Sequence, residues 1–256
     1  MSLSLSSLRH LRGLLLPALL LAGWEFMSRQ DASGAYAFVP LADICKSLVA
    51  LIIGGELFVN MFASLARTSS GLFFGILFGV ALGVLMALSR VADRLIGPLL
   101  HSIRQVPMLG WIPLIAMWFG NGEFSKVFIV SLAAFYPMVL NTYEGFSHVD
   151  RRLREVGRVL ELKPFQQFFH VLLPAALPSI ATGVLHALAF AWVTAVGSEL
   201  FLSSGAGLGN LMMNAEAGSR MDVIVLSVLC IGLLGYLMNL LFTRLASHLL
   251  RWRNLR

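Results

Sequence analysis

The chain has 256 residues, of which 58% are hydrophobic and only 12% are charged. Soluble domains carry roughly twice that share of charged residues, so the composition excludes a water-solvated globule and indicates an integral membrane protein. The apolar runs are continuous rather than alternating, which favours an all-α transmembrane bundle over a β-barrel. Basic residues that flank membrane spans explain the net charge of +6, and we expect no nucleic acid partner.

Six apolar segments each come near or exceed the roughly 20 residues that cross a bilayer. The sequence therefore predicts a polytopic bundle with spans at residues 11–29, 57–88, 95–119, 124–143, 178–200 and 222–246. The first segment follows Arg9 and Arg12 and has features of a signal peptide. No small-x-small cleavage site follows it cleanly, so we interpret it as an uncleaved span.

The distribution of Lys and Arg predicts the orientation of the bundle. With the amino terminus inside the cell, four such residues are on the outer side, Arg29, Lys46, Lys126 and Arg220. Thirteen are then on the inner side: Arg9, Arg12, Arg90, Arg94, Arg151, Arg152, Arg154, Arg158, Lys163, Arg244, Arg251, Arg253 and Arg256. This asymmetry places both termini and the loop at residues 144–178 in the cytoplasm.

The outer segment after the first span contains an amphipathic pattern that begins at Pro40. Apolar residues recur there at helical spacing, at Leu41, Ile44, Cys45, Leu48 and Ile52. The pattern predicts a helix at the outer membrane interface. Residues 1–56 then form an amino-terminal span with a periplasmic helix, residues 57–246 the membrane core, and residues 247–256 a basic cytoplasmic tail.

The second span carries four glycines spaced by four residues, Gly71, Gly75, Gly79 and Gly83. On a helix they form one stripe that lets another backbone approach closely. We interpret the stripe as helix packing, with a close contact at a subunit interface as the alternative.

Polar residues inside the third and fifth spans are candidates for a transport path. The third span has prolines at 98, 107 and 113, which break backbone hydrogen bonds that lipid cannot replace. Its arginine either snorkels to the cytoplasmic end or lines a pore in a kinked helix. In the fifth span, the glutamate either reaches water at the outer end or contributes to the path. The candidates are Arg104, Gln105, Trp111, His186, Trp192 and Glu199.

No constellation of residues indicates catalysis. Cys45 and Cys230 lie in apolar contexts without a spacing pattern, and the six histidines show no ligand spacing. No phosphate-binding loop is present, and we interpret the run GAGLGN at 205–210 as a turn. We therefore expect no enzyme activity, no metal and no cofactor.

The loop at 144–178 predicts two short helices. The first has an apolar stripe at Leu153, Val156 and Leu160, opposite a basic stripe of arginines. The second begins at Pro164 and has a phenylalanine-rich face. Such a pair either docks on a protein or lies on anionic lipid, and periodicity alone does not separate the two.

This loop resembles the EAA loop of ATP-binding-cassette importer permeases. Glu155-Val156-Gly157, Val171 and Leu173-Pro174 fall at matching positions. Several other stretches, including SLARTSSGLFFGILFGVALG and SSGAGLGNLM, are similar to the branch that imports sulfonates, taurine and nitrate, within the type I (MetI-like) superfamily. The resemblance covers about residues 36–253.

The resemblance implies a type I permease fold and a homodimer in the bacterial inner membrane. It also implies two cytoplasmic ATPase subunits and a periplasmic substrate-binding protein. The solute would be a small anion, such as an aliphatic sulfonate, taurine or nitrate, with Arg67 or Arg104 able to contribute. The ATPase-coupling residues would be Leu153, Glu155, Val156, Gly157, Leu160, Glu161, Leu173 and Pro174.

Two residues depart from the family pattern. Val156 replaces an alanine, and Glu161 stands where the turn between the helices usually has glycine. If that turn needs a positive φ, glutamate costs on the order of 1 kcal/mol. The alternatives are a permease for bicarbonate or a pyrimidine precursor, a secondary carrier of small anions, which would need no docking loop, and a membrane-embedded enzyme, which would need a clustered polar site.

Overall fold

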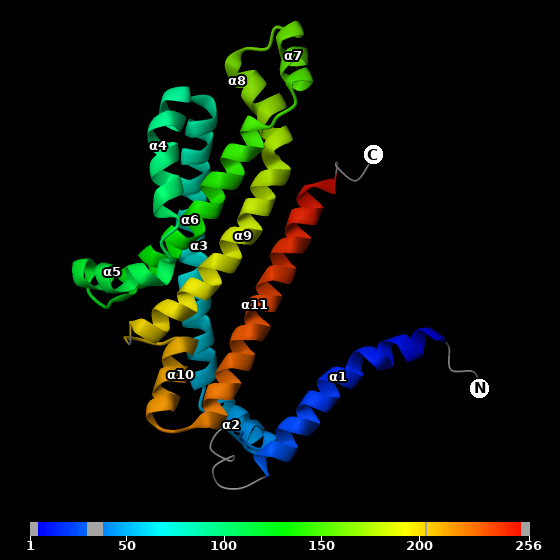
Figure 1. The fold of residues 1–256 in the computed structure, drawn as a ribbon, viewed down its shortest axis with the longest axis vertical. Helices are drawn as coiled ribbons and strands as arrows, with labels where there is room; N and C mark the ends of the chain where they lie inside the picture. Colours follow the sequence, from blue (N-terminus) through cyan, green and yellow to red (C-terminus); the bar gives the residue numbers. More distant parts are fainter. Residues whose placement is uncertain (1–4, 30–37, 203, 252–256) are drawn as a thin grey trace.

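The computed structural model describes residues 5–29, 38–202 and 204–251, and all regular elements in these ranges are helices (Figure 1). The elements in chain order are α1 (Leu5–Ser28), α2 (Leu41–Ile53), α3 (Glu56–Leu88), α4 (Arg90–Ile103), η1 (Met108–Trp111), α5 (Ile112–Phe119), α6 (Glu123–Ser147), α7 (Arg151–Val159), α8 (Pro164–Gln167), η2 (Phe168–Leu172), α9 (Leu173–Phe201), α10 (Leu208–Ala217) and α11 (Met221–Leu249). The predicted all-α class is confirmed.

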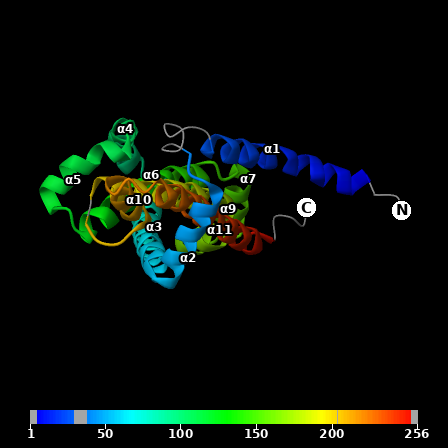
Figure 2. The same ribbon diagram turned by 90° about the horizontal axis from the view of Figure 1, so that it is seen from below.

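Four of the described helical segments are long and apolar enough to cross a membrane: Glu56–Leu88, Glu123–Ser147, Pro164–Phe201 and Met221–Leu249. They match the second, fourth, fifth and sixth predicted spans. The first predicted span corresponds to α1, whose apolar part at Leu15–Ser28 is shorter. In both views α1 extends away from the other helices (Figures 1 and 2).

The prediction of one continuous span at 95–119 was wrong. α4 ends at Ile103, and residues 104–107 form turns before the 3-10 segment η1 and the short helix α5. Pro107 has no amide hydrogen and disfavours helical backbone at the preceding residue, which explains the break. The apolar content of the segment concealed this interruption.

The glycine stripe of α3 packs directly against α6. A Cβ atom added at Gly71, Gly75, Gly79 or Gly83 would lie within 2.7 Å of a side-chain atom of α6. The opposing α6 residues share the spacing of four: Val130, Ala134, Met138 and Thr142. The two helices therefore approach along two matched rows of residues, as small-residue interfaces in membranes allow.

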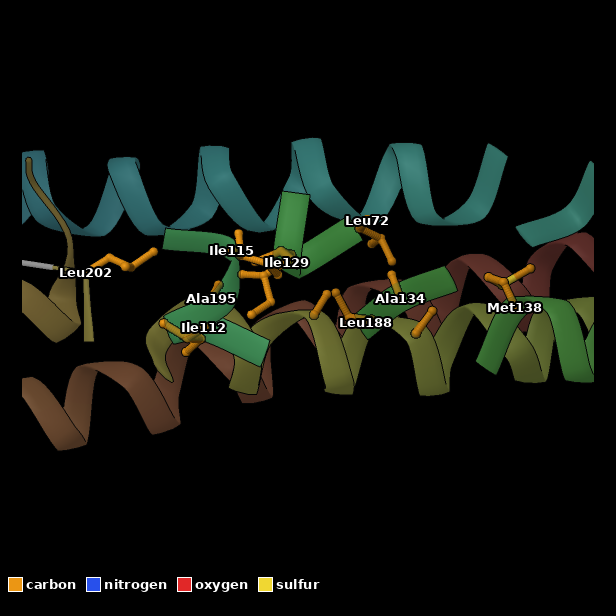
Figure 3. Close-up of a cluster of buried hydrophobic side chains, with 12 residues drawn as sticks. Leu72, Ile112, Ile115, Ile129, Ala134, Met138, Leu188, Ala195 and Leu202 are labelled. Carbon is orange, nitrogen blue, oxygen red and sulfur yellow. The ribbon is translucent and has the colours of Figure 1, made fainter. Parts of the chain in front are cut away.

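The main core lies where α3, α6 and α9 meet and where α5 covers them. Ile112 and Ile115 of α5 pack there with Ile129 of α6 and Leu188 of α9 (Figure 3). A second apolar cluster joins α2 to α10 and α11 and includes Ile44. α2 begins after Pro40, where the amphipathic pattern begins. α11 ends at Leu249 and so includes the first residues of the predicted tail, and half of that tail, residues 252–256, lies outside the described ranges.

Candidate functional site

The 144–178 loop folds into α7, α8 and η2 at one end of the bundle (Figure 1). α7 begins where the side chain of Asp150 accepts a hydrogen bond from the amide of Arg152, at 2.9 Å. It ends in a Schellman motif, with bonds from Leu162 N to Gly157 O and from Glu161 N to Arg158 O. Glu161 occupies the left-handed position of this motif, with φ of 50°.

Two hydrogen bonds hold α7 against the ends of the long helices, and an aromatic stack joins those ends to each other. Nη2 of Arg154 donates to the carbonyl of Phe146, at the end of α6, at 2.7 Å. Nε2 of Gln167 in α8 donates to the carbonyl of Arg154 at 3.4 Å. The ring of Phe146 stacks on that of Phe168, with centroids 5.4 Å apart. α7 is thus attached to both α6 and the segment that continues into α9.

The outer side of α7 presents apolar side chains to the surroundings of the chain. Val156 is 55% exposed, Val159 is 83% exposed and Leu160 is 64% exposed, and Leu153 is also exposed. Glu155 pairs with Arg151 at 2.9 Å on the same exposed helix. An apolar patch of this kind, rimmed by charges, is typical of a protein interaction site.

The other predicted coupling residues lie behind this surface. Gly157 is buried, and a Cβ there would lie 3.5 Å from Gln167 and 3.6 Å from Val171. Leu173 and Pro174 begin α9 and are half-buried. They join the loop to the long helix rather than forming its exposed face.

An ionic cluster, buried except for Glu123, occupies the opposite end of the bundle. We define it as Arg67 of α3, Glu123 and Lys126 of α6, and Glu199 of α9, with Ser64 of α3. Arg67 donates bidentately to Glu123, at 2.7 and 3.0 Å, and its other terminal nitrogen contacts Glu199. Ser64 donates to both oxygens of Glu199, at 2.8 and 3.0 Å. Lys126 lies 3.9 Å from Glu123 and donates to the carbonyl of Ser204.

The cluster also caps α10. The carboxylate of Glu199 accepts from the amide of Gly209 at 2.8 Å, and the hydroxyl of Ser64 accepts from the amide of Leu208 at 2.9 Å. Asn60 accepts from the amide of Gly207 at 2.7 Å. Side chains from two other helices therefore satisfy the free amides at the start of this helix.

The run GAGLGN is more than the turn that we expected, because α10 begins at Leu208 within it. A Cβ at Gly207 would lie 2.5 Å from the carboxylate carbon of Glu199, and a Cβ at Gly209 would lie 2.7 Å from Cβ of Glu199. The glycines allow the backbone to approach this carboxylate. This arrangement was not predicted from the sequence, although a buried arginine in a span implies nearby acidic partners.

The six candidates for a transport path do not gather at one place. Trp192 packs in the apolar cluster with α10 and α11, and Glu199 belongs to the ionic cluster rather than reaching water. His186 is exposed on α9, and Trp111 packs beside the main core. Arg104 and Gln105 are exposed at the break after α4.

Comparison with known proteins identifies the family. The family model described as "Binding-protein-dependent transport system inner membrane component" matches residues 75–254. A solved structure of the MetNI methionine ABC transporter, captured facing inward, shares the fold with a TM-score of 0.64 at 22% identity, covering 75% of this chain and 95% of that chain.

Curated relatives agree with this assignment. SsuC of Bacillus subtilis, a permease protein named for the transport of aliphatic sulfonates, is 35% identical, over 95% of this chain and 88% of the relative. SsuC of Escherichia coli is 37% identical, over 93% and 90%. CmpB of Synechococcus elongatus, a bicarbonate transport system permease protein, is 30% identical, over 77% and 69%.

Membership accounts for the main features of the chain. Several apolar helices cross the inner membrane, and hydrolysis of ATP belongs to a separate ATPase subunit, while a binding protein delivers the solute. The chain therefore belongs to the family of binding-protein-dependent transport system inner membrane components, the permease subunits of ATP-binding-cassette importers.

Proposed function

We propose that two copies of this chain form the transmembrane path of an importer for small organic anions of the aliphatic sulfonate class. Two ATPase subunits on the cytoplasmic side drive it, and both termini of the chain face the cytoplasm. The asymmetry of Lys and Arg supports this orientation, since thirteen of them fall on the side of α7. The similarity to the two SsuC proteins supports the solute class.

The observation that carries the proposal is the exposed apolar face of α7 on a helix that is fixed to the ends of α6 and α9. This face, formed by Leu153, Val156, Val159 and Leu160, would insert into a cleft on the ATPase, and Glu155 would meet a basic group there. Closure of the ATPase pair by ATP would move α7 and shift the population of the permease between inward-open and outward-open states.

The direct test is co-purification of the tagged chain with its ATPase subunit. We expect Val156→Asp and Glu155→Arg to abolish ATPase recovery and sulfonate uptake, while the chain still inserts into the membrane. Lys46→Glu is the control, because this residue lies on α2, 78% exposed, at the other end of the molecule. Normal uptake together with normal ATPase recovery in both α7 variants would disprove the coupling role.

The same preparation distinguishes an ATP-driven importer of sulfonates from the alternative transporters. Uptake that survives ATP depletion while an ion gradient is intact would indicate a secondary carrier instead. Uptake of bicarbonate without uptake of sulfonates would support the assignment as an importer and show that its solute is bicarbonate.

A further inference from the structure

Arg104 is a cation that ends a helix halfway along the bundle. It is the C-cap residue of α4, which starts at the same end of the molecule as α7 and stops about midway along α9 (Figure 1). Its side chain is exposed, and within the described residues it forms no ion pair or side-chain hydrogen bond. A charge at this depth is costly unless it faces a water-filled cavity or a charged partner.

The side chain of Arg104 lines a cavity of about 310 Å³ between the helix break, α6 and α9. The break contributes Val106, η1 contributes Met108, α6 contributes Tyr136 and Leu140, and α9 contributes Phe190. The guanidinium of Arg104 and the phenol of Tyr136 are therefore the polar side-chain groups in the walls of this cavity, and the other lining side chains are apolar.

The other candidate arginine is not available to a solute. Arg67 is 3% exposed, and two carboxylates and a backbone carbonyl occupy its nitrogens. Two larger cavities, of about 570 and 540 Å³, have no charged side chain in their walls. Among these three cavities, the one beside Arg104 alone combines a cation with apolar walls.

We propose that this cavity is the site in the transport path that holds an anion with an apolar tail. The sulfonate group would lie on the guanidinium, whose planar set of donors matches an oxyanion. The tail would lie against Phe190, Leu140 and Met108. This assignment rests on the proposed function and adds to it the place in the path where the solute binds.

The size of the cavity favours an organic anion over an inorganic one. At about 30 Å³ for each water molecule in the liquid, a cavity of 310 Å³ holds about ten water-sized groups. Nitrate or bicarbonate would fill a small part of this volume and leave its apolar walls in contact with water. An alkyl chain of several carbons would cover them.

The test uses the complete importer in proteoliposomes, with ATPase and binding protein, and compares uptake of hexanesulfonate with that of methanesulfonate. We expect Arg104→Gln to lower uptake of both by roughly tenfold or more, the range that loss of a hydrogen bond to a charged group predicts. Arg104→Lys should retain part of the activity. Arg94→Gln, which removes an exposed arginine from the same helix outside the cavity, should have no effect.

A second variant tests the contact between the cavity and the apolar tail of the solute. Phe190→Ala should lower the ratio of hexanesulfonate uptake to methanesulfonate uptake by roughly tenfold, since removal of a hydrophobic wall affects only the longer solute. A defect in folding alone would reduce both solutes equally and leave the ratio unchanged.

The outcomes separate this inference from the proposed function. If the wild-type importer takes up neither sulfonate, the proposed solute class is wrong. If it takes up both and Arg104→Gln has no effect, or Phe190→Ala leaves the ratio unchanged, the site assignment is overturned while the importer stands. If Arg104→Gln separates the two copies of the chain on a sizing column, Arg104 is a subunit contact and the site assignment is likewise overturned.

Discussion

Arg67 and Glu199, which lie 132 residues apart in the chain, form an ion pair in which the two side chains are only 2% and 0% exposed. Removal of two charges from water is costly, and such a pair persists only where further hydrogen bonds satisfy both groups. Here Glu123 contacts the guanidinium, and Ser64 and Gly209 contact the carboxylate. The pair thereby joins α3 to α9 and to the start of α10.

Removal of the cation from this cluster should destabilise the protein strongly. Arg67→Gln leaves Glu199 buried without its guanidinium, and we expect a loss of about 3–5 kcal/mol of stability. Thermal unfolding of the purified complex in detergent measures it. Glu123→Gln is the comparison, because the side chain of Glu123 is 60% exposed and solvent screens its contribution to about 1 kcal/mol or less. Equal losses in the two variants would contradict a buried ion pair.

The contact between α3 and α6 should not tolerate a methyl group. Gly79→Ala places a Cβ 2.5 Å from Cβ of Met138 and 3.0 Å from the carbonyl of Phe135, so the helices must separate. We expect destabilisation of about 1–3 kcal/mol, measured by the unfolding midpoint. Gly232→Ala in α11 meets no atom within 4 Å and should be neutral or stabilising, by up to about 1 kcal/mol. If both variants behave alike, the α3 stripe is not a packing surface.

Glycine in place of Glu161, the left-handed residue at the end of α7, should stabilise this turn. Glu161→Gly removes the cost of a Cβ at φ of 50°, and we expect a local gain of about 1 kcal/mol. Hydrogen exchange of the α7 amides measures this gain as slower exchange. The same substitution inside the helix, Glu155→Gly, should lose about 1 kcal/mol and speed exchange. Faster exchange in Glu161→Gly would show that the glutamate side chain itself stabilises the turn.

The bond between Arg154 and the end of α6 should determine how firmly α7 is held. Arg154→Met removes a charged donor to the carbonyl of Phe146, and we expect a loss of about 1.5–3 kcal/mol of local stability. The α7 amides should exchange faster, and ATPase activity should respond less to the loaded binding protein. Arg158→Met, on the exposed side of α7, is the control. Unchanged exchange in both variants would assign the hold on α7 to the hydrogen bond from Gln167 to the carbonyl of Arg154 instead.

The fold was largely predictable because its dominant signals are local. Apolar length identified the four long helices, and the spacing of the α3 glycines identified a packing face. The break at residues 104–107 was missed because the hydrophobic run masks an interruption of only four residues. Pro107 was the available signal, but prolines also occur within continuous helices here, at 98, 137 and 178.

The ionic cluster was not predictable because its members come from separate helices. Arg67 and Glu199 were each visible as charges in or near spans, yet their pairing depends on the relative rotation and height of α3 and α9. A single sequence does not contain that information. The glycines at 207 and 209 had the same limitation, since the need for them arises from a carboxylate on another helix.

The π-helical segment η2 lies inside one continuous helical run from Pro164 to Phe201. A π-turn contains one residue more than an α-turn. The residues that precede η2 are therefore rotated by one residue position around the axis of α9. One residue corresponds to about 100° of rotation. Deletion of a single residue from 168–172 would restore α-helical geometry and swing the Phe165 side of the loop about a quarter of a turn around α9. Under the coupling role that we propose for α7, this one inserted residue sets the direction from which the loop faces the ATPase subunit.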